Sequence, residues 1–242
     1  MTDPVRAIAN AVLYEGYLLW PYRGSALKNQ RPFSFGDLDP VGRPAMHTEC
    51  LLEGGDPAAV QVTVRFLQDT LEREVGVGPV AFGALAGEVT YGAERLEPDL
   101  HRLTVEISSR AGVFRGTHAI LHTPSGGFVS LTDPPAGLRA AAEGCRNDGA
   151  WPVLVGEPGS RDTLLASPMI LEDHPRIAPE SPGDLFDGGE IDALLTLSIM
   201  ALTDAEKAEV RAGDPRGREL LERTEGLSRE QLMRLYGFRQ ER

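Results

Sequence analysis

Lysine and cysteine are both rare in this 242-residue chain, and arginine supplies most of its positive charge. The only lysines are Lys28 and Lys207, and the formal net charge is −12. Nucleic acids and anionic membrane surfaces are themselves negative, and they select proteins with clustered cations. The charge therefore argues against DNA, RNA or an anionic lipid surface as the main partner.

Long apolar runs and targeting signals are missing as well. The first residues, MTDPVRAIANAV, lack a basic region followed by an apolar run and a cleavage site. No later segment offers the roughly 18 uninterrupted apolar residues of a membrane-spanning helix. These absences predict a soluble, cytoplasmic protein without membrane insertion. The only cysteines, Cys50 and Cys145, are expected to be free thiols, because a reducing compartment opposes disulfides.

Sequence motifs for metal, nucleotide or nucleophile chemistry are also lacking. His118 and His122 are four residues apart, but they lie in a segment with strand periodicity and do not form a helical His-Glu-x-x-His face. No GxGxxG or GxxxxGK loop occurs, and the acidic pair Asp187 and Glu190 fits a helix start better than a calcium loop. The sequence therefore predicts no metal and no cofactor, and it favours a non-enzyme over an enzyme.

Residue periodicity predicts an α+β fold. Asp3-Pro4 followed by apolar residues at helical spacing predicts a short N-terminal helix that ends near Gly16. Apolar and polar residues alternate in VQVTVRFLQ and LHRLTVEISSR, which is typical of half-buried strands, and the turn at 124–127 predicts an antiparallel hairpin. We expect an antiparallel β-sandwich or barrel-like sheet over residues 46–133, with a set of short helices in the C-terminal third.

The chain is expected to divide near residue 135. Residues 1–135 would hold the N-terminal helix, an aromatic-basic segment and the antiparallel sheet. Residues 136–242 would hold a Pro/Gly-rich wrap and the C-terminal helices, packed on the sheet as one unit. We define the wrap as residues 144–192; its short apolar runs favour a segment folded over the sheet rather than a linker.

The aromatic-basic segment, residues 14–35, holds six of the fifteen aromatic residues together with Arg23, Lys28 and Arg31. Aromatic rings beside cations suit a partner-binding surface, because rings bring contact area and arginine brings a planar set of donors. The candidate partner-binding residues are Tyr17, Trp20, Tyr22, Arg23, Lys28 and Arg31. The alternative is that these rings pack the opening helix onto the sheet while the cations reach outward into solvent.

Five segments together carry a family resemblance. They are YEGYLLWPYRGSALKNQRPFSFG, TECLL, VTVRFLQ, the run from CRNDGAWPVLVGEPGSRD to SPGDLFDGGEID, and LMRLYGF. The chain resembles, over nearly its whole length, a bacterial family encoded beside NiFe hydrogenase genes. The resemblance implies an accessory, assembly or maturation role, with a hydrogenase subunit or maturation factor as the partner. It supplies no catalytic residues, because none is assigned in that family.

A second hypothesis is a small-molecule or metal-handling enzyme with a pocket between the sheet and the wrap. Its polar candidates are Cys145, Arg146, Asp148, Arg161, Asp162, His174 and Asp184. In this reading Arg146 could lower the pKa of the Cys145 thiol, but the sequence favours an inert cysteine, because it has no Cys-x-x-Cys motif and no His-Asn partner pattern. A third hypothesis is a purely structural subunit of a larger complex, and the sequence leaves open a homo-oligomer.

Overall fold

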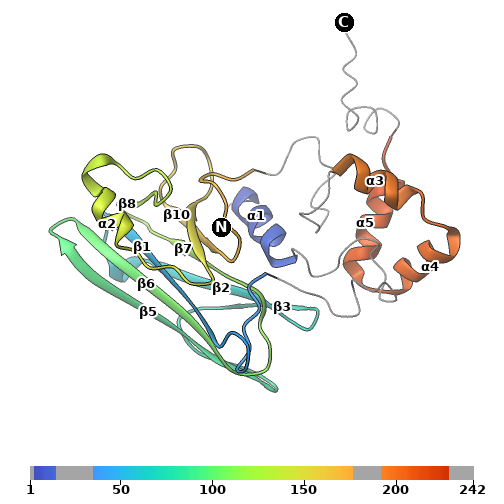
Figure 1. Cartoon of the computed structure of the whole chain (residues 1–242), viewed down its shortest axis with the longest axis horizontal. Helices are drawn as coiled ribbons and strands as arrows, with labels where there is room; N and C mark the ends of the chain where they lie inside the picture. Colours follow the sequence, from blue (N-terminus) through green and yellow to red (C-terminus); the bar gives the residue numbers. More distant parts are fainter. Residues whose placement is uncertain (1–2, 15–34, 177–191, 229–242) are drawn as a thin grey trace, which may run out of the picture. The chain divides into compact units, whose positions relative to one another are not determined.

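The computed structural model describes residues 3–14, 35–176 and 192–228 (Figure 1). The chain separates into two compact units: a sandwich unit, residues 1–13 with 35–176, and a helical unit, residues 14–34 with 177–242. The boundary expected at residue 135 falls inside the sandwich unit. The first 33 residues of the wrap, 144–176, therefore belong to the same unit as the sheets.

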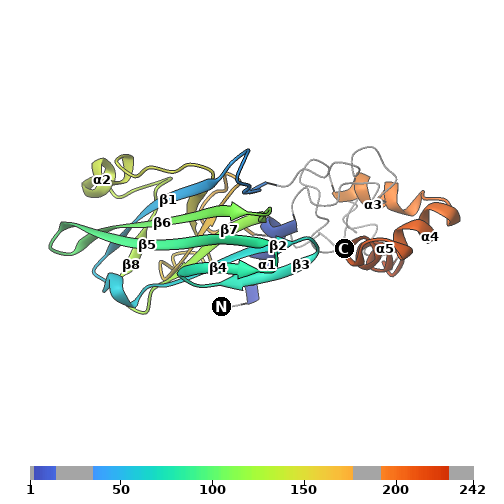
Figure 2. The same cartoon turned by 90° about the horizontal axis from the view of Figure 1, so that it is seen from below.

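Two antiparallel five-stranded sheets form the sandwich unit (Figures 1 and 2). Sheet 1 has the order β4 (Gly78–Phe82), β5 (Leu85–Glu97), β6 (Leu100–Ala111), β1 (Ala45–Glu53) and β8 (Gly127–Val129). Sheet 2 has the order β3 (Leu71–Val75), β2 (Gln61–Gln68), β7 (Arg115–His122), β10 (Thr163–Ser167) and β9 (Trp151–Leu154). The predicted α+β fold with a β-sandwich is confirmed.

The main core lies between the two sheets, because alternate residues of each strand point to the same face. On β2, Val62, Val64 and Phe66 are buried in this core. Phe66 packs against Phe114 with ring centroids 4.6 Å apart. The alternation that identified this strand in the sequence is therefore the pattern of its inward-facing side chains.

Strands β9 and β10 come from the wrap, where the sequence suggested little regular structure. The residues Leu164, Leu165 and Ala166 are all buried, so β10 lacks the alternation of a half-buried strand. Both faces of this part of sheet 2 are covered, which favours continuous apolar runs. Short runs of this kind do not distinguish a strand from a buried helix by periodicity alone.

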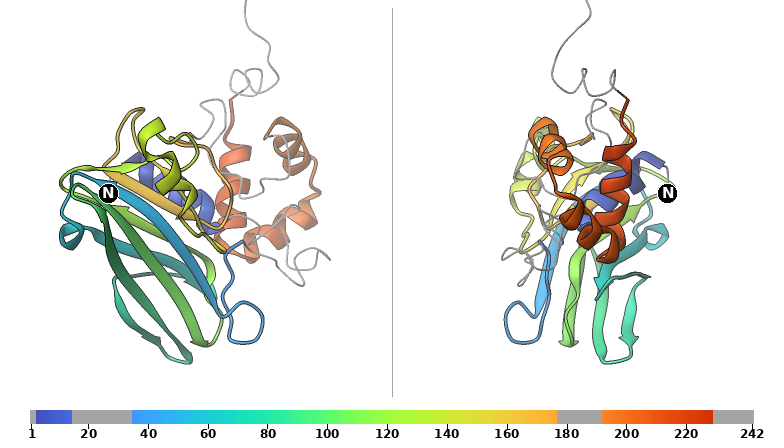
Figure 3. Two further views of the ribbon diagram at one scale, coloured as in Figure 1. Left: turned by 60° about the vertical axis from the view of Figure 1, so that its left-hand side comes forward. Right: turned by 90° about the vertical axis from the view of Figure 1, so that its right-hand side faces the viewer.

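Helix α1 (Asp3–Tyr14) covers the outer face of sheet 2 (Figure 3). Val5, Ala9 and Val12 recur at helical spacing and form a second core cluster with residues of β7, β9 and β10. The members contributed by sheet 2 and its following loop are Ile120, Val153, Val155 and Leu165. The expected N-terminal helix is present and ends two residues before Gly16.

A smaller cluster covers the outer face of sheet 1. It joins Leu51, Leu100 and Val129 to Ala142 of the short helix α2 (Arg139–Glu143). Two single-turn 3₁₀ helices, η2 (Pro57–Ala59) and η3 (Ala136–Leu138), complete this unit.

The helical unit contains α3 (Asp192–Met200), α4 (Asp204–Ala212) and α5 (Pro215–Glu225). Helix α4 begins with a capping box, in which Thr203 and Glu206 bond each other's backbone N–H groups. Lys207 and Arg211 of α4 both form ion pairs with Glu225 of α5. Within the described ranges, no helix has the length and apolarity needed to cross a lipid bilayer.

Candidate functional site

The candidate partner-binding residues of the aromatic-basic segment lie outside the described residues. These are Tyr17, Trp20, Tyr22, Arg23, Lys28 and Arg31. The two flanks of the segment are described, and both lie against the start of β7. A Cβ atom placed on Gly116 would be 2.4 Å from the Leu13 carbonyl oxygen, and the Thr117 N–H donates to the Gly36 carbonyl oxygen at 3.0 Å. The chain therefore leaves the sandwich unit and returns to it at neighbouring residues of β7.

The returning flank, residues 35–44, is held firmly on the sandwich. Leu38 and Phe114 exchange two backbone hydrogen bonds of 2.8 and 2.9 Å, and Arg115 forms a 2.9 Å ion pair with Asp37. Asp39 closes a tight turn, because its carboxylate accepts N–H bonds from residues 41 and 42. These hydrogen bonds lower the pKa of the Asp39 carboxyl group, and the bond from Gly42 has the largest effect.

Three apolar side chains remain exposed on this flank and the neighbouring β6–β7 turn. Phe35 is 40% exposed, Val41 95% and Val113 38%. We call these three residues the base surface, because they adjoin the points where the aromatic-basic segment joins the sandwich. Apolar side chains on a rigid loop are available for a partner at little cost in conformational entropy.

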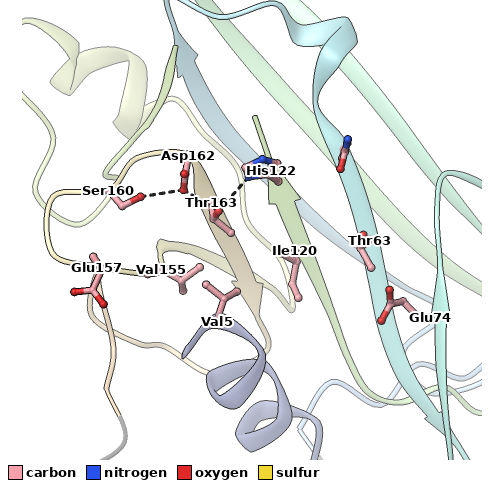
Figure 4. A pocket seen from close by; sticks show the side chains of 12 residues that line it. Val5, Thr63, Glu74, Ile120, His122, Val155, Glu157, Ser160, Asp162 and Thr163 are labelled. Atoms are coloured by element: carbon pink, nitrogen blue, oxygen red, sulfur yellow. Dashed lines mark hydrogen bonds between the residues drawn. The ribbon is translucent and has the colours of Figure 1, made fainter. Parts of the chain in front are cut away.

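A pocket lies at the other end of β7, on the outer face of sheet 2 (Figure 4). Its volume is about 600 Å³, and its walls come from α1, β2, β3, β7, the start of β10 and the loop between β9 and β10. The described lining residues are Val5, Gln61, Thr63, Glu74, Ile120, His122, Val155, Gly156, Glu157, Ser160, Asp162 and Thr163. This size is within the range typical of small-molecule sites.

A chain of hydrogen bonds fixes the polar wall of the pocket. Strand register places Thr163 of β10 opposite His122 of β7. The Thr163 hydroxyl donates to the Asp162 carboxylate at 2.9 Å, and Nδ1 of His122 lies 3.3 Å from the same hydroxyl oxygen. Because that hydroxyl has already donated its one proton, it can only accept from His122.

Asp162 is the centre of this wall. Ser160 also donates to its carboxylate, at 2.9 Å. Burial opposes ionisation of Asp162, but the hydrogen bonds from Thr163 and Ser160 outweigh it and lower the pKa of this carboxyl group. Asp162 thus presents a stable negative charge at the pocket at neutral pH.

Of the seven pocket candidates from the sequence, Asp162 lines this pocket. Five of the other six lie elsewhere in the described residues. Cys145, Arg146 and Asp148 lie against β1: the Arg146 N–H donates to Glu49 at 2.7 Å, and Asp148 pairs with Arg43 at 2.8 Å. The remaining candidates are Arg161, paired with Glu53; His174, whose N–H donates to Leu154; and Asp184, outside the described residues.

Cys145 does not have the surroundings of a reactive thiol. Burial raises its pKa, and this effect exceeds the lowering by the nearby Arg102. Cys50 is fully buried in the main core, where burial raises its pKa further. Both cysteines are free, as expected from the sequence.

The sequence reasoning did not select His122, Glu74 or Glu157 as pocket residues. The one available signal was the spacing of His118 and His122, which places both side chains on the same face of β7. Their surroundings differ: His118 is completely buried and His122 is exposed at the pocket. Within the described part of the chain, no three His, Cys, Asp or Glu side chains converge as metal ligands.

No protein-family model matches the chain, and neither a curated protein nor a solved structure was found to be similar to it.

Proposed function

We propose that the protein is an accessory, assembly or maturation protein of a NiFe hydrogenase, and that it acts by binding a hydrogenase subunit or maturation factor. The link to hydrogenase rests on the sequence resemblance. The structural observation that supports a binding role is the base surface, where Phe35, Val41 and Val113 are exposed on a firmly held flank of the aromatic-basic segment.

The residue types of the base surface and of the aromatic-basic segment favour a partner that offers apolar and acidic groups. Arg23, Lys28 and Arg31 of the aromatic-basic segment provide cations within a protein of net charge −12. Interfaces typically bury aromatic and apolar anchors at the centre, and charges at the rim determine orientation and association rate. The base surface would supply apolar anchors, and the segment would supply rings and cations.

Pull-down from hydrogenase-expressing cells, followed by mass spectrometry, tests the proposal. We expect the wild-type protein to recover a hydrogenase subunit or maturation factor, and Val41→Asp or Arg23→Ala with Lys28→Ala to reduce recovery several-fold. Val77→Asp is the matched control, because Val77 is 54% exposed at the separate β3–β4 turn. Melting temperatures of Val41→Asp and Val77→Asp should stay near that of the wild type, since these exposed side chains contribute little to stability. Equal recovery with all variants would refute the proposed surface.

A small-molecule or metal-handling enzyme is the second candidate function. The pocket favours it, because the pocket combines an apolar wall with converging polar groups and is lined by both sheet 2 and residues 155–163 of the wrap. The two candidates concern opposite ends of β7, so one does not exclude the other.

A further inference from the structure

We propose that the His122 pocket binds a small organic cation, namely an ammonium or guanidinium group carried on a short aliphatic chain. This inference is independent of the proposed hydrogenase role. It rests on the hydrogen-bonding character, the charge and the shape of the pocket.

The polar groups of the pocket are mainly hydrogen-bond acceptors. Carboxylates of Glu74, Glu157 and Asp162 line it. The hydroxyl protons of Ser160 and Thr163 are already directed to Asp162. A ligand that satisfies these groups must bring several N–H donors, as ammonium and guanidinium groups do.

The charge of the pocket also selects a cation. Among the described lining residues there are three carboxylates and no arginine or lysine. Arg65 lies 3.8 Å from Glu74 and offsets part of that one charge. The first turn of α1 contributes Val5 to the wall, and a helix N-terminus carries only about half of a positive charge. The balance therefore remains negative.

The apolar wall distinguishes an organic cation from a metal ion. Val5, Ile120 and Val155 lie on one side of the pocket (Figure 4), where the small exposed parts of Val5 and Ile120 could contact methylene groups, while Val155 is fully buried behind them. A metal ion would require ligands grouped around a single point, and no such group of three occurs among the described residues. The volume of about 600 Å³ also accommodates more than an ion.

Isothermal titration calorimetry of the full-length protein tests this inference. The probes are agmatine, which carries both cationic groups, n-butylamine, the anion butyrate, and zinc chloride. We expect saturable one-to-one binding of agmatine, weaker binding of n-butylamine and none of butyrate. Combining Asp162→Asn with Glu157→Gln should weaken agmatine binding at least about tenfold, because two charge-assisted contacts are lost.

The matched control is Glu97→Gln, a similar removal of negative charge at an exposed position of β5 outside the pocket lining. It should leave agmatine affinity unchanged. NMR shifts of the His122 imidazole on agmatine addition should locate binding in the pocket. The inference is overturned if agmatine does not bind at millimolar concentration, if butyrate or zinc binds more tightly, or if the double variant binds as well as Glu97→Gln.

Discussion

His118 shows how one buried side chain makes stability depend on pH. Its Nδ1 donates to the Gly116 carbonyl oxygen at 2.9 Å, while its buried Nε2 has no hydrogen-bond partner. Burial lowers the pKa of His118 to about 4, and the nearby Arg65 acts in the same direction. The imidazole is therefore neutral in the folded protein at pH values where the unfolded chain already binds a proton.

The sign of this effect follows from proton linkage. The unfolded His118 titrates near pH 6.5 and the folded one near pH 4, so the unfolded state is favoured as the pH falls through this window. As the pH falls from 7 to 5, protonation of His118 in the unfolded state should lower the free energy of unfolding by about 2 kcal/mol. The contribution is fully present above pH 6.5 and is lost as the pH approaches 4.

His118→Leu tests this prediction. Leucine removes the titrating group and the unpaired Nε2 at a similar volume, but it also leaves the Gly116 carbonyl without this donor, so we expect a loss of about 1–3 kcal/mol at pH 7. The free energy of unfolding is measured with urea at pH 7 and at pH 5. The loss in this free energy between the two pH values should be about 2 kcal/mol smaller in the variant than in the wild type. An equal difference in both proteins would show that other groups cause the acid sensitivity. His122→Leu is the control, because His122 is exposed.

Cys145 is expected to react slowly with thiol reagents. Burial raises the pKa of its thiol, so less of the reactive thiolate is present than in a free thiol at the same pH. Its reaction with Ellman's reagent at pH 8 should be slower than that of glutathione. The kinetic phase that belongs to Cys145 is the one that disappears in Cys145→Ser. A Cys145 rate above the glutathione rate would instead support an activated cysteine and strengthen the enzyme hypothesis.

At the scale of secondary structure, the contact between α1 and β7 depends on a glycine. Gly116 has a φ of +58°, and a Cβ atom there would lie 2.4 Å from the Leu13 carbonyl oxygen. Gly116→Ala should therefore destabilise the protein by about 1–3 kcal/mol, because the side chain adds both backbone strain and a clash with α1.

Gly92→Ala on β5 is the matched control for this substitution. No atom lies within 4 Å of a Cβ placed at Gly92, and its φ is not in the left-handed region. Chemical denaturation should show a clear loss of stability for Gly116→Ala and almost none for Gly92→Ala. Amide hydrogen exchange in α1 should rise in the Gly116 variant if the helix docks less firmly. Equal stability of the two variants would argue against close packing of α1 on β7.

The elements that could be predicted from the sequence are those with local signals. The alternation in β2 and β6, the proline start of α1 and the capping box of α4 each lie within one short segment. Strands β9 and β10 have no local alternation, because α1 covers the outer face of the sheet that they join. Their assignment depends on tertiary burial, which a single segment does not reveal.

The pocket was less predictable than the fold for a similar reason. His122 and Asp162 are 40 positions apart in the sequence, and they meet only through the register of β7 with β10. Glu74 reaches the same pocket through the pairing of β2 with β3. Asp162 could be selected because it lies in the Pro/Gly-rich wrap, whereas His122 and Glu74 lie on strands that looked purely structural.

At the scale of the whole molecule, the division into two units predicts where protease will act. Arg161 belongs to the sandwich unit, where Nε donates to the Phe128 carbonyl oxygen at 2.8 Å and Nη2 pairs with Glu53 at 2.9 Å. Arg176 is exposed and is the last residue of that unit. Limited trypsin treatment should therefore cut after Arg176 well before it cuts after Arg161.

Mass spectrometry of the early fragments checks this order. Arg161→Lys keeps a trypsin site but loses the planar guanidinium contacts, so cleavage at residue 161 should become faster in this variant. If the wild-type chain is cut at Arg161 as rapidly as at Arg176, the 155–163 loop is not held on sheet 2. The pocket would then lose one of its walls.

Helix α1 also sets an order of events during protein synthesis. Its apolar residues are made before those of sheet 2, yet their nearest partner in sequence, Ile120, follows Val12 by 108 positions, and Leu165 follows by 153. At translation rates of about 5–20 residues per second, the helix must wait roughly 5–30 s for these partners. The apolar face of newly made α1 is therefore without its native cover until the last strand of sheet 2 has emerged.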